Sequence, residues 1–354
     1  NVYVRNPPNL FHHKLLELLA AGRPVLAFPG ETDESRTIAN SVKAMLFACN
    51  DQGQIYQALD QAQSTATVLS DKTALNEFSS QHQAGRLIEL FTETIKHCKE
   101  VGIKRYRLSC KLFPLLTDPT LKIQVEELPN YENIVSLLSQ VGRTANLLEV
   151  NLSIHPDQFV VLGSNKDSVC EKSITELNFH AWVLDMCGMP QDYTCPINIH
   201  PSLSNFESPE KFINKLMNNF FRCDTGVKKR LVFENEDKGF WNCANLYEYF
   251  HQYMKHNFNF AFPLTFDNLH DEANPSLDEK GEKIDISKWF LKFYSTWNVE
   301  PVFHWSQAAE GTVRNHCKNL TKDPIDFGLD VTWEIEVKGK DKGFKHLLKK
   351  YRNI

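Results

Sequence analysis

The chain has 354 residues, 42% of them hydrophobic and 23% charged, which is the composition of an ordinary globular protein. This length allows one to three domains, and a single α/β barrel with extensions falls within that range. The formal net charge of −5 excludes the overall basic footprint that is typical of nucleic-acid-binding chains, although a local patch can still bind phosphates. We find no apolar run long enough to span a bilayer and no signal peptide, so we expect no membrane association.

The nine cysteines are scattered, and none forms a Cys-x-x-Cys pair. This spacing argues against a thiolate zinc ribbon and against a disulfide scaffold. It favours a reduced, intracellular protein, located in the cytoplasm or, in a eukaryote, the nucleus. We expect the protein to be a monomer.

Residues 1–22 are predicted to form a helical extension, and the run "RPVLAFPG" (23–30) a first strand. The polar residues 50–82 indicate a surface insertion, or a helix plus a loop. From about residue 100, short β-type runs alternate with longer amphipathic helical patterns. The β-type runs are 104–109, 147–154, 195–199, 230–235, 262–267, 300–304 and 331–337. Eight strands, each followed by a helix, predict a (β/α)8 TIM barrel over residues 23–354.

Six of the predicted strands end in residue types that bind metals. These are His155, His200, Glu234, Asp267, His304 and Glu336, with His270 and His316 close behind two of them. The carboxyl ends of barrel strands face one mouth, so these side chains are expected to converge. Imidazole and carboxylate together suit Mn, Zn or Fe. The set exceeds the needs of one tetrahedral ion and predicts two or three ions, the arrangement that cleaves phosphoesters.

Each of these residues has a simpler interpretation when taken alone. A single histidine at a strand end is more often a satisfied polar residue than a ligand, and a single Glu or Asp is usually a helix cap or a salt-bridge partner. The same position recurs on six strands, and this recurrence favours the metal site. His180 lies on a helical face and is predicted to be structural.

The chain resembles the UV damage endonucleases in seven segments, in their order along the family, from about residue 85 to the C-terminus. The segments are "YRLSCKLFP", "SIHPDQFVVL", "INIH", "LVFENEDK", "FDNLH", "FHWS" and "EVKGKDK". The resemblance implies a TIM barrel with up to three divalent ions, commonly Mn, with Zn or Mg as alternatives. It also implies hydrolysis of double-stranded DNA immediately 5′ to UV photoproducts, namely cyclobutane dimers and 6-4 photoproducts. The implied metal ligands are the eight residues above, of which Glu234, Asp267, His304 and Glu336 form the catalytic set.

Three positions depart from the family pattern. Val302 stands where the family usually has a carboxylated lysine that bridges metals, and valine cannot ligate a metal. Asp118 stands where the family often has a histidine ligand, and we expect it to bind metal in that place. The family's lesion-probing glutamine and tyrosine fall on Gln158 and Phe159, so the tyrosine hydroxyl is lost.

Gln158 is expected to bond base edges, and Phe159 to wedge into the duplex. The alternative for Phe159 is a core aromatic, because the sequence around it is apolar. Three lysines that follow the last strand could hold DNA phosphates or could belong to a solvated helix start. They are Lys338, Lys340 and Lys342. Asn198 and Asp185 are candidates for orienting the site histidines.

Three other functions fit parts of the pattern. A sugar isomerase or epimerase also places His, Glu and Asp at barrel strand ends, but needs only one or two ions and a closed pocket. An abasic-site endonuclease with three zinc ions differs mainly in its lesion. A damage-binding protein with weak or no nuclease activity is suggested by Val302. The exposed position expected for Gln158 and Phe159 favours a polymer substrate.

Overall fold

The computed structural model divides into two compact units, Asn1–Arg86 and Leu87–Ile354, each described here by itself. The described residues are 2–4, 15, 18–19, 23–30, 32–64, 80–112, 116–117, 124–128, 131–202 and 205–351. Among them, no helix is long and apolar enough to cross a membrane.

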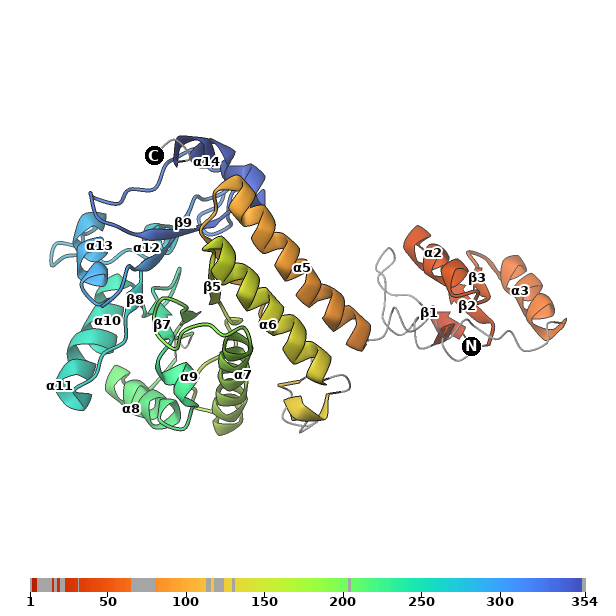
Figure 1. The fold of residues 1–354 in the computed structure, drawn as a ribbon, viewed down its shortest axis with the longest axis horizontal. Coiled ribbons are helices and arrows are strands. Elements are labelled where there is room, and N and C mark those ends of the chain that lie inside the picture. The colour runs from red at the N-terminus through yellow and green to blue at the C-terminus, as the bar shows by residue number, and fades with distance from the viewer. Residues whose placement is uncertain are drawn as a thin grey trace. The chain divides into compact units, whose positions relative to one another are not determined.

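The N-terminal unit contains a three-stranded parallel sheet in the order β1-β2-β3 (Figure 1). Its elements are β1 (Val2–Val4), β2 (Val25–Phe28), α2 (Asp33–Ser41), β3 (Leu46–Ala48) and α3 (Gln52–Ser64).

The prediction that residues 23–30 form the first barrel strand is therefore wrong, because β2 pairs with β1 and β3 instead. A short apolar run reports that a strand is buried, but not which sheet it joins. Residues 2–4 of the predicted helical extension are also a strand. The unit boundary falls at residues 86 and 87 rather than at 22 and 23.

Seven strands of the C-terminal unit coincide with the remaining seven predicted runs. They are β4 (Arg105–Leu108), β5 (Asn151–Ile154), β6 (Ile197–Ile199), β7 (Leu231–Glu234), β8 (Leu264–Thr265), β9 (Val302–Ser306) and β10 (Thr332–Glu336). The first five form one parallel sheet in chain order, and β9 pairs with β10. A parallel bridge between Asp267 and His304 joins the two sheets. Side chains connect β10 back to β4, since Arg107 contacts Glu336, and this closes the ring.

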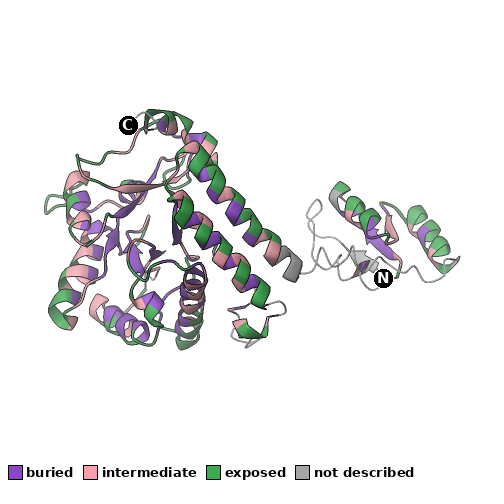
Figure 2. Cartoon of the chain, in the orientation of Figure 1, coloured by how far each residue is buried: buried purple, intermediate pink, exposed green. Residues whose placement is uncertain are grey.

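Helices follow the strands and surround them, with their exposed faces turned outward and the strands buried inside (Figures 1 and 2). The longer ones are α5 (Ser80–Val101), α6 (Tyr131–Leu148), α7 (Asp167–Met186), α8 (Pro209–Phe220) and α13 (Ile286–Tyr294). The shorter ones are η1 (Val125–Glu127), α9 (Thr225–Lys228), α10 (Cys243–Tyr247), η2 (Glu248–Tyr253), α11 (Met254–Phe258), α12 (Asn268–Ala273), η3 (Lys340–Phe344) and α14 (Lys345–Tyr351). Ser208 and Pro209 are residue types that favour the start of a helix. The Ser208 hydroxyl caps α8, and Pro209 occupies its first turn.

The buried core of this unit is rich in aromatic rings, and Val302 belongs to it. Arg230 is fully buried just before β7, at the amino-terminal end of that strand. Its Nη1 lies 2.7 Å from Asp185 Oδ1, and its Nη2 donates to the carbonyl oxygen of Met189. Asp185 thus supports the barrel's far side, and the prediction that it orients a site histidine is wrong.

Candidate metal centre and adjoining pocket

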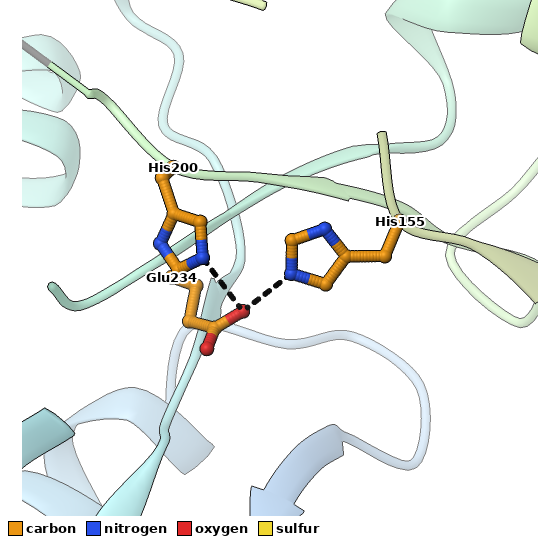
Figure 3. Close-up of side chains that lie close together, drawn as sticks. All are labelled: His155, His200 and Glu234. Atoms are coloured by element: carbon orange, nitrogen blue, oxygen red, sulfur yellow. Dashed lines mark hydrogen bonds and ion pairs between the residues drawn. The ribbon is translucent and has the colours of Figure 1, made fainter. Parts of the chain in front are cut away.

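Glu234 lies at the centre of the barrel mouth, at the end of β7, with 1% of its side chain exposed. Its Oε2 atom is 3.2 Å from His155 Nε2, 3.1 Å from His304 Nδ1 and 3.9 Å from His200 Nε2. His155 and His200 directly follow β5 and β6, and His304 lies within β9, so three other parallel strands bring these rings to one carboxylate. Figure 3 shows His155 and His200 pointing toward Glu234 from two sides.

Asp267 and His270 complete this ring on the side of β8. Asp267 caps helix α12, because its Oδ1 accepts the backbone N–H of His270 at 2.7 Å. The helix turn then places His270 Nδ1 3.2 Å from Glu234 Oε1 and 4.0 Å from Asp267 Oδ1. Asn235 fixes the loop, accepting from the Asp267 N–H and donating to its carbonyl oxygen.

Glu336 and His316 lie at the edge of the ring, the first at the end of β10 and the second in the loop that follows β9. Glu336 Oε1 is 3.6 Å from His304 Nδ1, and its Oε2 is 3.6 Å from His316 Nε2. Eight of the nine predicted ligands are thus brought together, and their role as ligands stays a prediction. Asp118 lies outside the described residues.

Unbonded polar atoms at the centre of the cluster fit a metal site. Three buried atoms of the central residues make no hydrogen bond: Glu234 Oε1, Asp267 Oδ2 and His304 Nδ1. Such atoms are costly to bury unless something binds them. Two groups offer ligand atoms that all lie within 4.8 Å of one another: His155, His200 and Glu234, and Glu234, Asp267 and His304. Glu234 belongs to both, so the donor set suits two divalent ions that share one carboxylate.

The charges in the cluster are strongly coupled. Burial alone would raise the pKa of Glu234, but neighbouring His304 holds it well below its usual range. Burial would lower the pKa of His270, but the charges of Asp267 and Glu234 raise it to about 10. Burial lowers the pKa of His200 to about 3. At neutral pH, the protein alone therefore places acidic and cationic groups side by side in the mouth.

A second polar layer lies beneath the ring, and Ser153 and Glu334 in it were not predicted. Asn198 Nδ2 donates to Glu234 Oε2 at 2.5 Å and lies 3.5 Å from His304 Nε2, so its role in orienting a site histidine stays a prediction. Ser153 Oγ bonds Glu334, and Arg107 Nη1 lies 3.6 Å from Glu334 and 2.5 Å from Glu336. Ser153, Asn198 and Glu334 each precede a predicted ligand by two positions. Side chains two apart on a strand share a face, so this spacing was the signal that would have found them.

A cavity of about 900 Å³ opens beside the metal ligands. His155, His200 and His270 line one part of it, and Gln158 and Phe159 line another. The Phe159 residue is 72% exposed, so its interpretation as a core aromatic is wrong. The cavity therefore joins candidate metal ligands to an exposed aromatic ring.

The cavity wall also contains polar residues that were not predicted, among them Glu236 and Lys238. Burial raises the pKa of Glu236 to about 7, while its carboxylate accepts the backbone N–H of Ser202. Lys338, Lys340 and Lys342 are exposed after β10, as either of the two predicted roles requires.

A parallel barrel with carboxylates and imidazoles gathered at its mouth is the architecture of a barrel enzyme. The sequence model of the family described as UV-endonuclease UvdE matches residues 65–354. The chain belongs to this family.

Individual relatives agree with the family match. The chain is 28% identical over 263 residues to the UV DNA damage endonuclease of Nostoc sp., covering 73% of this chain and 76% of the relative. It is 25% identical over 283 residues to the UV DNA damage endonuclease of Deinococcus radiodurans, covering 76% of this chain and 86% of the relative. The crystal structure of SacUVDE has the same fold, with a TM-score of 0.60 and 22% identity over 75% of this chain and 87% of that one.

Proposed function

We propose that this chain is a DNA repair endonuclease that nicks the backbone immediately 5′ to UV photoproducts, both cyclobutane dimers and 6-4 photoproducts. It would use two or three divalent ions, Mn by preference. The observation that carries the proposal is one cavity lined both by candidate metal ligands and by an exposed aromatic ring. Membership of the UV-endonuclease family supports a DNA substrate. Acting on DNA, the protein would work inside the cell, as a monomer.

Two metal positions follow from the ligand groups. His155, His200 and Glu234 would hold one ion, and Asp267 and His304 would hold a second together with Glu234. Bound divalent ions would activate water and stabilise the attacking and leaving oxygens of the phosphodiester. The protein's part is to hold the other four side chains around Glu234 and to keep the pocket shaped for the DNA backbone.

Glu336 and His316 would contribute to a third position. They face each other at 3.6 Å but stand outside both compact groups. Val302 is 2% exposed and packs in the hydrophobic core, so no ligand comes from that point of β9. Three ions would therefore be held with one bridging group fewer than the family pattern implies.

Recognition of the lesion would fall to Gln158 and Phe159. The exposed ring can enter a base step, at a cost of a few kcal/mol that is smallest where the step is already damaged. The Gln158 amide can bond the edges of unstacked bases. Exposed lysines after β10, namely Lys338, Lys340 and Lys342, would hold backbone phosphates.

The test uses two matched duplexes, one with a single cyclobutane dimer and one undamaged, each incubated with the protein and Mn. We expect a nick at the phosphodiester 5′ to the dimer and none in the undamaged duplex. Glu234→Gln should abolish nicking, whereas Glu282→Gln, on an exposed loop, should not. Selective binding without a nick would support the damage-binding alternative. Neither binding nor nicking would contradict the proposal.

A further inference from the structure

Glu334 is a nearly buried carboxylate whose place in the site is not explained by the metal groups. It stands on β10 directly opposite His304 on β9 in the parallel register. Only 10% of its side chain is exposed, and it belongs to neither compact ligand group. A buried charge of this kind needs partners that justify its burial.

The two nitrogens of His304 face different carboxylates. Nδ1 lies 3.1 Å from Glu234 Oε2 and 3.6 Å from Glu336 Oε1, on the side of the candidate metal groups, and makes no hydrogen bond. Nε2 lies 3.5 Å from Glu334 Oε2, on the opposite side of the ring. The ring thus has one nitrogen available to a metal and the other beside an anion.

Glu334 is itself held in place from two directions. Its Oε1 accepts a hydrogen bond from the Ser153 hydroxyl on β5, and its Oε2 lies 3.6 Å from Arg107 Nη1 on β4. The amide Nδ2 of Asn198 also lies 3.5 Å from His304 Nε2, but an amide nitrogen only donates and cannot accept the Nε2–H. A hydrogen bond to an anion is about twice as strong as a neutral one, so Glu334 is the stronger partner for Nε2.

We propose that Glu334 is a positioning residue of the candidate metal centre, whose carboxylate accepts the Nε2–H of His304 and keeps Nδ1 turned toward Glu234. Metal-binding histidines commonly donate their second N–H to a carboxylate or a backbone carbonyl, which fixes the orientation of the ring. His155 follows the same rule, with its Nδ1 3.0 Å from the carbonyl oxygen of Pro156. This inference rests on the proposed function, because it requires the metal centre.

The test is a titration of the full chain with Mn, reading affinity and the number of ions bound. We expect Glu334→Ala to weaken Mn binding by about 10- to 100-fold, the usual effect of losing such a partner. Glu334→Gln keeps a carbonyl oxygen that can accept the Nε2–H, so its Mn affinity should fall less than that of Glu334→Ala. Ser153→Ala removes the hydroxyl that bonds Glu334 but keeps the carboxylate. Its Mn affinity should also fall less than that of Glu334→Ala. Glu282→Ala, on an exposed loop, is the matched control and should bind as the unmodified chain does.

A double-mutant cycle separates positioning from a general structural role. In a His304→Ala background, Glu334→Gln should cause no further loss of Mn affinity, because the ring that it orients is gone. If Glu334→Gln lowered Mn affinity equally with His304 present and with His304→Ala, the proposal would be overturned, since Glu334 would then act without His304. If Glu334→Ala does not fold, the cycle and Ser153→Ala decide the question.

The same titration keeps this proposal apart from the proposed function. An unmodified chain that binds Mn but does not nick damaged DNA would contradict the nuclease and leave the positioning role standing. A chain that nicks DNA while Glu334→Ala binds Mn with unchanged affinity would contradict the positioning role alone. An unmodified chain that binds no Mn would overturn both.

Discussion

Arg107 on β4 and Glu336 on β10 form an ion pair, with Nη1 2.5 Å from Oε1, that joins the first and last strands of the barrel unit. The same guanidinium faces Glu334 at 3.6 Å. Burial would raise the pKa of Glu336, but Arg107 and His304 lower it to about 2. One cation therefore neutralises the acidic edge of the site and closes the ring.

Replacing this cation should destabilise the metal-free protein. We expect Arg107→Met to lower the free energy of unfolding by about 2–3 kcal/mol, less than for a fully buried pair, because 34% of the Arg107 side chain is exposed. Saturating Mn should recover part of the loss, since bound cations would neutralise the same carboxylates. Chemical denaturation with and without Mn measures both effects. Arg222→Met, which breaks an exposed pair with Glu171, is the control and should cost below about 1 kcal/mol. Equal losses for the two variants would contradict this role.

Removing the exposed ring should affect DNA recognition and not folding. Phe159→Ala should change the free energy of unfolding by less than about 0.5 kcal/mol. Its preference for dimer-containing over undamaged duplex should fall by about tenfold, because stacking contributes about 1–3 kcal/mol per base. Competition binding with the two duplexes measures this preference. Phe221→Ala removes a ring that is 57% exposed just after α8, and should leave the preference unchanged. Unchanged discrimination in Phe159→Ala would rule out the wedge.

Mn binding should release protons. Burial would lower the pKa of His304, but the charges of Glu234 and Glu336 raise it well above its usual value, so it carries a proton at pH 7.5 that a metal on this ring must displace. Glu234, whose pKa is lowered, and His200, whose pKa is about 3, carry none to displace. Mn affinity should therefore rise with pH from 6 toward 9, by about tenfold per unit for each proton displaced. Calorimetry in buffers of different ionisation enthalpy counts these protons, and a count of zero would contradict a metal on His304.

Val302 should contribute packing alone. The side chain is 2% exposed within the core, so Val302→Ala should lower the free energy of unfolding by about 2 kcal/mol through the lost contacts and the cavity left behind. The number of Mn ions bound per chain should stay the same. Val313→Ala, at a position that is 68% exposed, is the matched control and should change neither quantity. A change in Mn count on Val302→Ala would show that this part of β9 shapes the centre directly.

The N-terminal unit should be dispensable for nicking. Its hydrophobic clusters share no residue with those of the barrel unit, and helix α5 begins at Ser80. A chain of residues 80–354 should therefore fold and nick dimer-containing DNA at the rate of the full chain. Loss of activity in a truncated protein that still folds would assign residues 1–79 a part in binding DNA.

Periodicity in the sequence predicted the seven barrel-unit strands because buried parallel strands read as short apolar runs. It could not assign the run at 23–30, because the same pattern fits any buried parallel strand. Six predicted strand ends, with two histidines close behind them, located the eight side chains that the structure brings together. Glu334 escaped notice because a charge inside a strand is recognisable as part of a site only once its facing strands are known.

The most direct test of the account maps the cleavage product of a strand-labelled duplex that carries one cyclobutane dimer. The same protein preparation is titrated with Mn, for the unmodified chain and for Glu234→Gln. In the unmodified chain we expect a nick immediately 5′ to the dimer that requires Mn. In Glu234→Gln we expect both the nick and tight Mn binding to be lost. Nicking by Glu234→Gln at the unmodified rate, or nicking that persists after Mn is removed, would contradict a metal centre built on Glu234.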